Sequence, residues 1–126
     1  KAVNIEALTM IDMAVKQILP AVIEYTGTLS GIIQSLKAVD VTPTVQAELL
    51  RDIMSLLNEA NAAVRVLRKV TAEASGIQDN EERAHYYHDH VMTAMDDLRR
   101  PIDKLEMLVD KEVWPMPSYG DLIFEV

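Results

Sequence analysis

Apolar residues recur at alternating spacings of three and four along most of this chain. In its first third they form one continuous stripe, made of Leu8, Ile11, Val15, Ile18, Val22, Tyr25, Leu29, Ile32, Leu36 and Val39. This heptad-like pattern is typical of a helix that packs lengthwise against partner helices. It predicts a first helix over about residues 4–39, with Asn4 as its N-cap.

Two further stripes of the same kind follow, separated by turn and capping residues. The second stripe contains Leu49, Ile53, Leu56, Ala60, Ala63, Leu67, Val70 and Ala74; the third contains Ala84, Tyr87, Val91, Met95, Leu98, Ile102, Leu105 and Val109. Thr42 before Pro43 is typical of a helix start, and Gly76 favours a left-handed helix end. Asp79 with Glu82 resembles a capping box. These signals predict helices over about residues 43–75 and 80–113.

Short connections between long helices make consecutive helices antiparallel. We therefore expect an all-α fold in one domain, residues 1–126: an antiparallel up-down-up bundle of three long helices, followed by a non-helical C-terminal tail, residues 114–126. Pro20 and Pro101 fall inside the first and third helices, where proline removes a backbone hydrogen bond. Because each stripe persists on both sides of its proline, we predict continuous helices that bend together at these positions.

The tail combines helix-breaking residues with aromatic and apolar ones. Two prolines one residue apart stop the helix, and an apolar end follows them. A few buried aromatic side chains often dominate an interface. The predicted interaction residues are Trp114, Pro115, Pro117, Tyr119, Leu122 and Phe124. Two interpretations stay open and are compatible: the tail docks on a partner, or it folds back on its own bundle.

Composition narrows the class of protein further. The net charge of −8, from 20 acidic and 12 basic residues, argues against nucleic acid as a partner. The absence of cysteine excludes disulfides and thiolate metal sites and is compatible with a cytoplasmic protein. No stretch approaches the ~20 apolar residues that a membrane span requires. Because the chain begins at Lys1 without an initiator methionine, we interpret it as a fragment of a larger protein.

Candidate chemistry is concentrated in one histidine-rich segment. Glu81, His85 and His88 share a helix face, a pattern that permits a divalent metal ion, although a solvated polar surface near a helix start is the simpler explanation. The two histidines are three residues apart, whereas the helical zinc signature requires four and a further ligand elsewhere. Phosphotransfer through histidine is disfavoured because the surrounding residues are mostly acidic. We therefore predict no metal site at this segment.

Other routes to catalysis have little support in the sequence. No serine stands in a glycine-flanked nucleophile turn, and the four glycines form no phosphate-binding loop. The charged run that begins at Asp96 offers opposite pairs four residues apart, Asp96–Arg100 and Arg99–Asp103. Such a run is typical of a solvated helix face, and a partner-facing strip is the alternative. We predict no catalytic residue, cofactor site or metal site in this chain.

One set of residues carries a family resemblance. The set comprises Gln17, Ile18, Leu19, Pro20, Ala21, Ala84, Tyr87, Val91, Met95, Leu98, Arg99, Pro101, Asp103, Leu105, Glu106, Val109, Asp110, Trp114, Pro115, Pro117, Tyr119, Gly120, Asp121, Leu122 and Phe124. It resembles the C-terminal domain of type III glutamine synthetases. The resemblance is most specific in the tail and in the block from Leu98 to Val109, and weakest in the second helix. His88 and His90 lie outside the pattern.

The resemblance implies a non-catalytic domain of a larger enzyme. Members of that family are cytoplasmic ligases that make glutamine from glutamate, ammonia and ATP with divalent metal ions, and they form ring-shaped homo-oligomers. Their active-site motifs lie upstream of this region, so the resemblance assigns no catalytic residue here. It implies two partners: the catalytic core of the same polypeptide and neighbouring subunits. The alternative is a free-standing helical adaptor that binds partner helices along its apolar stripes.

Overall fold

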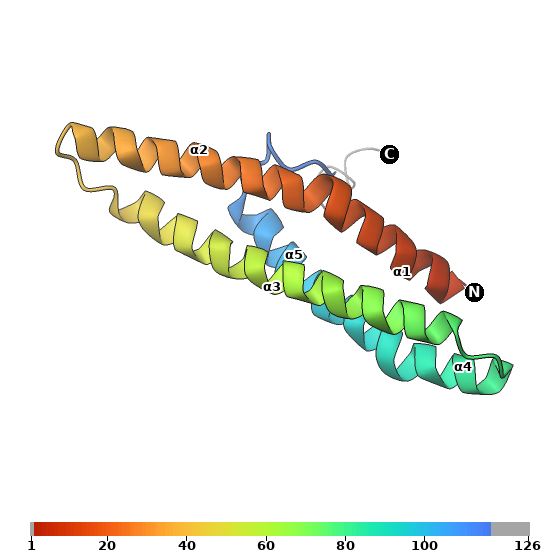
Figure 1. Cartoon of the computed structure of the whole chain (residues 1–126). Helices are drawn as coiled ribbons and strands as arrows, with labels where there is room; N and C mark the ends of the chain where they lie inside the picture. The colour runs from red at the N-terminus through yellow and green to blue at the C-terminus, as the bar shows by residue number, and fades with distance from the viewer. Residues whose placement is uncertain (1, 117–126) are drawn as a thin grey trace.

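The computed structural model describes residues 2–116, and within this range the chain is all-helical, without a β-strand (Figure 1). The elements in chain order are α1 (Ala2–Met13), η1 (Ala14–Ile18), α2 (Leu19–Ala38), α3 (Thr44–Ser75), α4 (Asn80–Tyr86), η2 (Tyr87–Val91) and α5 (Met92–Leu108). The two η elements are π-helical turns that join their neighbours without a break. The described chain thus contains the three predicted helical stretches: α1–η1–α2, α3, and α4–η2–α5.

The core is built around α3, which contacts both α2 and α5. Its buried side chains are Ile53, Ala60, Ala63, Val64, Leu67, Thr71 and Ala74. The small alanines let neighbouring helices approach closely along the middle of α3, and the larger Ile53 and Leu67 fill the space between helices. Burial confirms much of the predicted second and third stripes, including Ile53, Leu67, Leu98 and Leu105, all of which are fully buried.

Both internal prolines lie within continuous helix, in two different settings. Pro20 follows η1, in which the Leu19 amide donates to the carbonyl of Ala14 rather than to that of Val15. A π-turn widens the helix locally and is a known cause of bending. Figure 1 shows the first stretch bending where α1 meets α2. Pro101 is buried inside regular α5, well after η2. A matched bend at the two prolines stays a prediction.

Three of the predicted helix signals are wrong. Asn4 lies inside α1, which already begins at Ala2. α3 begins at Thr44 with Pro43 in the N-cap position and no side-chain cap, so Thr42 is not the cap. Gly76 has φ −85°, outside the left-handed region. Tight backbone bonds close the end of α3 instead, since the amides of Gly76 and Ile77 donate to Glu73 and Ala74. The Asp79 cap is confirmed, because its carboxylate accepts from the Glu82 amide at 2.8 Å.

The third helical stretch ends at Leu108, earlier than the predicted Val113. Val109 takes an extended conformation, and the Asp110 carboxylate accepts a hydrogen bond from the Glu112 amide at 2.9 Å. This side-chain bond stabilises a turn that competes with the helix, so the helix stops before the prolines are reached. The early end has a consequence for the first stripe. Ile32 and Val39 are 42% and 67% exposed, although both were predicted to face a partner helix.

Leu8 and Ala84, at the opposite end of their stripes, are also exposed. Both lie near the first residues of their helical stretches, where fewer neighbouring side chains surround them. The stripes therefore overestimate burial at both ends of the first helical stretch and at the start of the third, whereas Ala74 and Val109, at the ends of the second and third stripes, are buried. Among residues 2–116, none of the helices combines the length and the apolarity that crossing a bilayer requires.

The left-handed residue occurs at the end of α2 rather than of α3. Asp40 has φ 62°, and the amides of Asp40 and Val41 donate to the carbonyls of Lys37 and Leu36 at 3.1 and 2.9 Å. This pair of bonds is a Schellman motif, in which glycine is the usual left-handed residue. Asp tolerates the left-handed region better than most residues but still with a conformational cost.

We therefore expect Asp40→Gly to raise the free energy of unfolding by about 0.5–1 kcal/mol, because glycine adopts positive φ without steric penalty. Urea denaturation followed by circular dichroism measures the change. Asp40→Ala serves as the control and should destabilise the chain, since its Cβ keeps the penalty without the local polar interactions. Equal unfolding midpoints for the two variants would contradict the assignment.

Candidate docking surface

A turn after α5 sets the direction of the tail. The amides of Val113 and Trp114 both donate to the carbonyl of Asp110, at 2.9 and 3.1 Å, while the Asp110 carboxylate accepts from Glu112. The chain therefore reverses locally within a few residues of Leu108. Asp110 favours this turn because its short side chain accepts a hydrogen bond from the Glu112 amide, which in a continuing helix would pair with a backbone carbonyl.

The first tail residues pack on the bundle itself. Val113, Trp114 and Met116 are half-buried against the hydrophobic core, whereas Pro115 is exposed. Of the six predicted interaction residues, Trp114 thus contacts its own bundle and Pro115 faces solvent. Pro117, Tyr119, Leu122 and Phe124 lie outside the described residues. Packing of the Trp114 ring therefore fastens the first residues of the tail to the bundle.

A surface groove lies beside the end of α5. Its volume is about 430 Å³, and it is lined by Asp52, Ser55, Leu56, Lys104, Met107 and Leu108. The floor is apolar, with one carboxylate and one ammonium among the lining groups, and Met107 is 84% exposed. Met107 falls outside the third stripe, so the sequence pattern places it correctly at the surface but does not reveal the groove. The groove arises because α5 ends beside Asp52–Leu56 of α3 rather than continuing along it.

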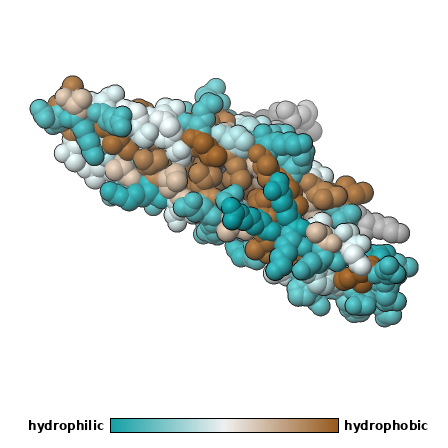
Figure 2. Space-filling model, viewed as in Figure 1, coloured by the Kyte–Doolittle hydropathy of each residue, from teal (hydrophilic) through white to brown (hydrophobic). Residues whose placement is uncertain are grey.

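A second groove, of about 310 Å³, lies between α1 and α3. It is lined by Asn4, Leu8, Ile11, Arg68, Thr71, Ala72 and Ser75. The Thr71 hydroxyl is buried there without a hydrogen-bond partner among the described residues. Figure 2 shows apolar side chains gathered along the middle of the visible face, over the first helical stretch and α3. Both grooves are shallow and mainly apolar, as suits contact with another protein surface better than enclosure of a small polar substrate.

The histidine-rich segment contains no metal centre in the described part of the chain, where no group of three or more histidine, cysteine or carboxylate side chains is placed to hold an ion. His88 pairs with the adjacent Asp89 at 3.2 Å, and both are largely exposed. His90 stacks against Tyr86, with ring centroids 4.4 Å apart. Tyr86 in turn donates to Glu73 of α3, a contact that the sequence pattern did not predict.

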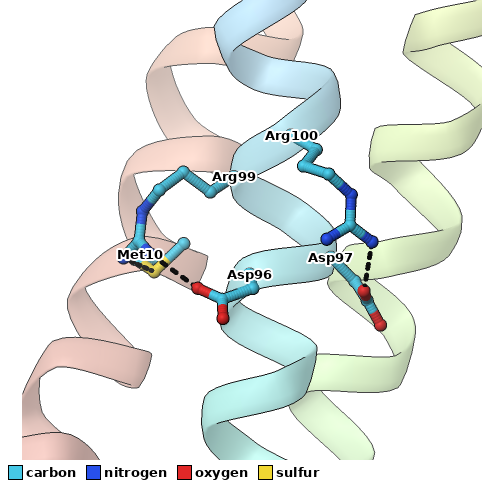
Figure 3. Close-up of polar contacts among 5 residues, drawn as sticks. All are labelled: Met10, Asp96, Asp97, Arg99 and Arg100. Carbon is cyan, nitrogen blue, oxygen red and sulfur yellow. Dashed lines mark hydrogen bonds and ion pairs between the residues drawn. The ribbon is translucent and has the colours of Figure 1, made fainter.

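The charged run of α5 forms pairs with a different spacing from the one predicted. Arg99 contacts Asp96 at 2.9 Å and Arg100 contacts Asp97 at 2.5 Å, so the pairs are three residues apart and the predicted Asp96–Arg100 and Arg99–Asp103 pairs are wrong. Arg99 also reaches the sulfur of Met10 on α1, at 3.7 Å (Figure 3). These exposed pairs contribute little stability, and Arg99 mainly joins α5 to α1 through contacts of its side chain.

Comparison with known proteins shows which proteins the chain resembles. The family model "Glutamine synthetase C-terminal domain" matches residues 1–37. Glutamine synthetase from Bacteroides fragilis is 27% identical over 128 residues, an alignment that covers 97% of this chain. Glutamine synthetase from Butyrivibrio fibrisolvens is 30% identical over 128 residues and covers 100% of the chain. The chain is therefore similar over nearly its whole length to part of known glutamine synthetases, and its first 37 residues match the model of their C-terminal domain.

A third relative is named as one particular type of glutamine synthetase. Type-3 glutamine synthetase from Dictyostelium discoideum is 28% identical over 134 residues, covering 98% of the chain. The chain spans only 18% of the length of each of these three relatives. The resemblance predicted from the third stripe and the tail is therefore confirmed, and the family match falls on the first helical stretch, which includes the Gln17–Ala21 segment.

The contact between Tyr86 and Glu73 gives a pH-dependent prediction. The Tyr86 hydroxyl donates to Glu73 Oε1 at 2.5 Å, and this bond, with partial desolvation and the nearby negative charge, raises the pKa of Tyr86 above its ordinary value. A raised folded-state pKa means that the contact stabilises the fold fully below the ordinary tyrosine pKa of 10.0 and loses this effect as pH rises through the raised pKa.

We expect Tyr86→Phe to remove the tyrosine ionisation whose pKa the Glu73 contact raises, measured by phenolate absorbance during alkaline titration. Glu73→Gln should move that ionisation to lower pH, because the acceptor then carries no charge. The contact is disproved if Glu73→Gln leaves the ionisation of Tyr86 where it was while the chain remains folded by circular dichroism.

Proposed function

We propose that the chain is the C-terminal domain of a type III glutamine synthetase and acts as a structural, non-catalytic module of that enzyme. In this proposal the parent enzyme makes glutamine from glutamate, ammonia and ATP with divalent metal ions, in the cytoplasm. Its active site lies in residues outside this chain. The support comes from alignments that cover 97–100% of the chain, one of them with a type-3 enzyme.

The described surface also supports a structural role. Its grooves are open and mainly apolar, and the charged side chains that line them, Asp52, Lys104 and Arg68, are exposed. Catalysis requires nucleophile, base and substrate to meet within hydrogen-bond reach in a site that excludes water. A long helical bundle with shallow grooves fits contact along its faces instead.

In the proposed arrangement the three helical stretches run up-down-up and antiparallel, as one stiff unit that carries the tail. The observation that carries the proposal is the packing of Val113, Trp114 and Met116 on the core. Because this packing fixes where the tail leaves the bundle, the residues after Met116 start from a defined position. Tyr119, Leu122 and Phe124 then serve as anchors on the catalytic core of the same polypeptide or on a neighbouring subunit of a homo-oligomer.

Two truncations of the parent enzyme test the tail, one without the proposed distal anchors and one that also lacks the packing of Trp114 on the bundle. Ending the polypeptide after Met116 removes only the proposed distal anchors, whereas ending it after Lys111 also removes Trp114. We expect both truncations to produce smaller oligomers and lower activity, measured by light scattering coupled to size exclusion and by glutamine formation. Unchanged oligomer size and activity in both truncations would refute the assembly function.

Trp114 should also contribute to the stability of the domain itself. We expect Trp114→Ala in the 126-residue chain to lower the free energy of unfolding by about 1–3 kcal/mol, because a half-buried aromatic side chain loses its packing. Trp114→Phe is the matched control and should retain most of the stability. If Trp114→Ala unfolds at the same urea concentration as the unmodified chain, the ring does not fasten the tail to the bundle.

A further inference from the structure

A furrow lies between the first and third helical stretches, which meet mainly where α1 faces η2 and α5. α2 and α5 both pack on α3 instead of on each other. Where α1 faces α5, two adjoining hollows of about 320 and 200 Å³ share part of their lining. That lining includes Ile5, Glu6, Met10, Met92, Met95 and Arg99. We call these six residues the methionine furrow.

The methionine furrow presents apolar side chains at the surface. Ile5 is 66% exposed and Met92 is 45% exposed, and Met10 lies half-buried on the facing helix. Arg99 spans the furrow, since its guanidinium pairs with Asp96 on α5 and reaches the sulfur of Met10 on α1 (Figure 3). Methionine side chains adapt their shape to apolar groups, and their sulfur atoms make favourable contacts with aromatic rings. The furrow therefore suits an apolar segment that carries an aromatic side chain.

The tail starts close enough to reach this furrow. Val113, Trp114 and Met116 pack on the core, and Figure 1 shows the residues after α5 running in the direction of α1. Met95 precedes the end of α5 by about four helix turns, or ~20 Å. The chain from Met116 to Leu122 spans up to about 20 Å when it is extended, at ~3.3 Å per residue. The apolar end of the tail can therefore lie over the furrow without any change in the bundle.

Burial at the start of the tail alternates from one residue to the next. Trp114 and Met116 are half-buried against the bundle, and Pro115 between them is exposed. Pro115 and Pro117 bias the residues before them towards extended backbone, in which successive side chains point to opposite sides. The same period, continued along the chain, predicts which side chains of the distal tail face the bundle.

This period divides the distal tail into two faces of different chemistry. The inner face, which continues Trp114 and Met116, carries Ser118, Gly120, Leu122 and Phe124, and the outer face carries Tyr119, Asp121, Ile123 and Glu125. Both carboxylates of the distal tail thus fall on the outer face, away from Glu6 and Asp96 of the furrow. The inner face is uncharged and ends in an aromatic ring, which is the chemistry that a methionine-lined surface favours.

We propose that the inner face of the distal tail docks in the methionine furrow of its own chain, with Leu122 and Phe124 over Met95 and Met92. The docking goes beyond the proposed function and does not depend on it, because it describes the free domain. In the parent enzyme the same two side chains are the proposed anchors on the core or a neighbouring subunit, so the partner competes with the furrow for them. Because the tail is tethered beside the furrow, its effective concentration there is high, and the furrow shields the apolar end until a partner displaces it.

The seven methionines of the chain supply the readout for a test. Methionine methyl signals in NMR spectra of the 126-residue chain are compared with those of the chain ended after Met116. The signals of the three furrow methionines should move on truncation, because they lose their apolar cover. Met54 and Met107 are exposed and lie outside the furrow, so their signals serve as internal controls and should stay in place.

Two neighbouring aliphatic residues test the assignment of the faces. Leu122→Ser on the inner face should reproduce the shifts that truncation causes, whereas Ile123→Ser on the outer face should leave the furrow signals unchanged. Both positions follow Met116, so the bundle keeps its sequence, and circular dichroism verifies its fold. Equal responses to the two variants overturn the proposal, as does a truncation that leaves the furrow signals in place. Movement of the Met107 signal instead assigns the tail to the groove beside α5 and also overturns it.

Dilution separates docking within one chain from docking between two copies. Furrow signals that do not depend on protein concentration support the proposal. Signals that move towards those of the truncated chain on dilution assign the furrow to the tail of a second copy and overturn it. If the furrow signals ignore truncation while the truncated parent enzyme forms smaller oligomers, this inference fails and the proposed assembly function stands. The opposite pair of results retains the docking and removes the assembly function.

Discussion

The packing of α3 against both of its neighbours is the interaction on which the rest of the molecule depends. α3 contributes Ile53, Ala60, Ala63, Leu67 and Ala74 to the core and contacts both α2 and α5. Each of the outer stretches buries its own stripe mainly through this shared helix. Because helices in proteins gain most of their stability from packing an amphipathic face, the outer helices persist where α3 supports them. Beyond the end of α5 at Leu108, α3 packs against α2 alone.

The early end of α5 produces two candidate interaction surfaces, the start of the tail and the uncovered end of the α2–α3 hairpin. The Asp110 turn ends α5 early and directs Trp114 onto the core, which fixes the start of the tail. The same early end leaves the α2–α3 hairpin without a third helix and exposes Val39 and Val45. The end of α5 at Leu108 thus decides where the bundle is closed and where it stays open.

Several features followed from the sequence because they depend on local chemistry. Asp79 caps α4 as its spacing to Glu82 suggests, and the stripe through Val91, Leu98 and Leu105 is buried as its period requires. Other local signals, for helix ends and for ion pairs, gave wrong predictions because the same residues are compatible with more than one conformation. Gly76 permits a left-handed end without requiring one, and the left-handed residue is Asp40, whose side chain only tolerates that conformation. The ion pairs of α5 took the three-residue spacing over the equally plausible four-residue one.

Periodicity and capping by themselves determined that the chain is helical and that it forms three stretches. These properties are encoded in neighbouring residues and in the repeat of a helix turn. Only the tertiary structure decided how far each stripe is buried, because burial depends on where a different helix ends. Ile18 and Ile32 occupy equivalent stripe positions, yet one is 4% and the other 42% exposed, since α5 does not extend to Ile32.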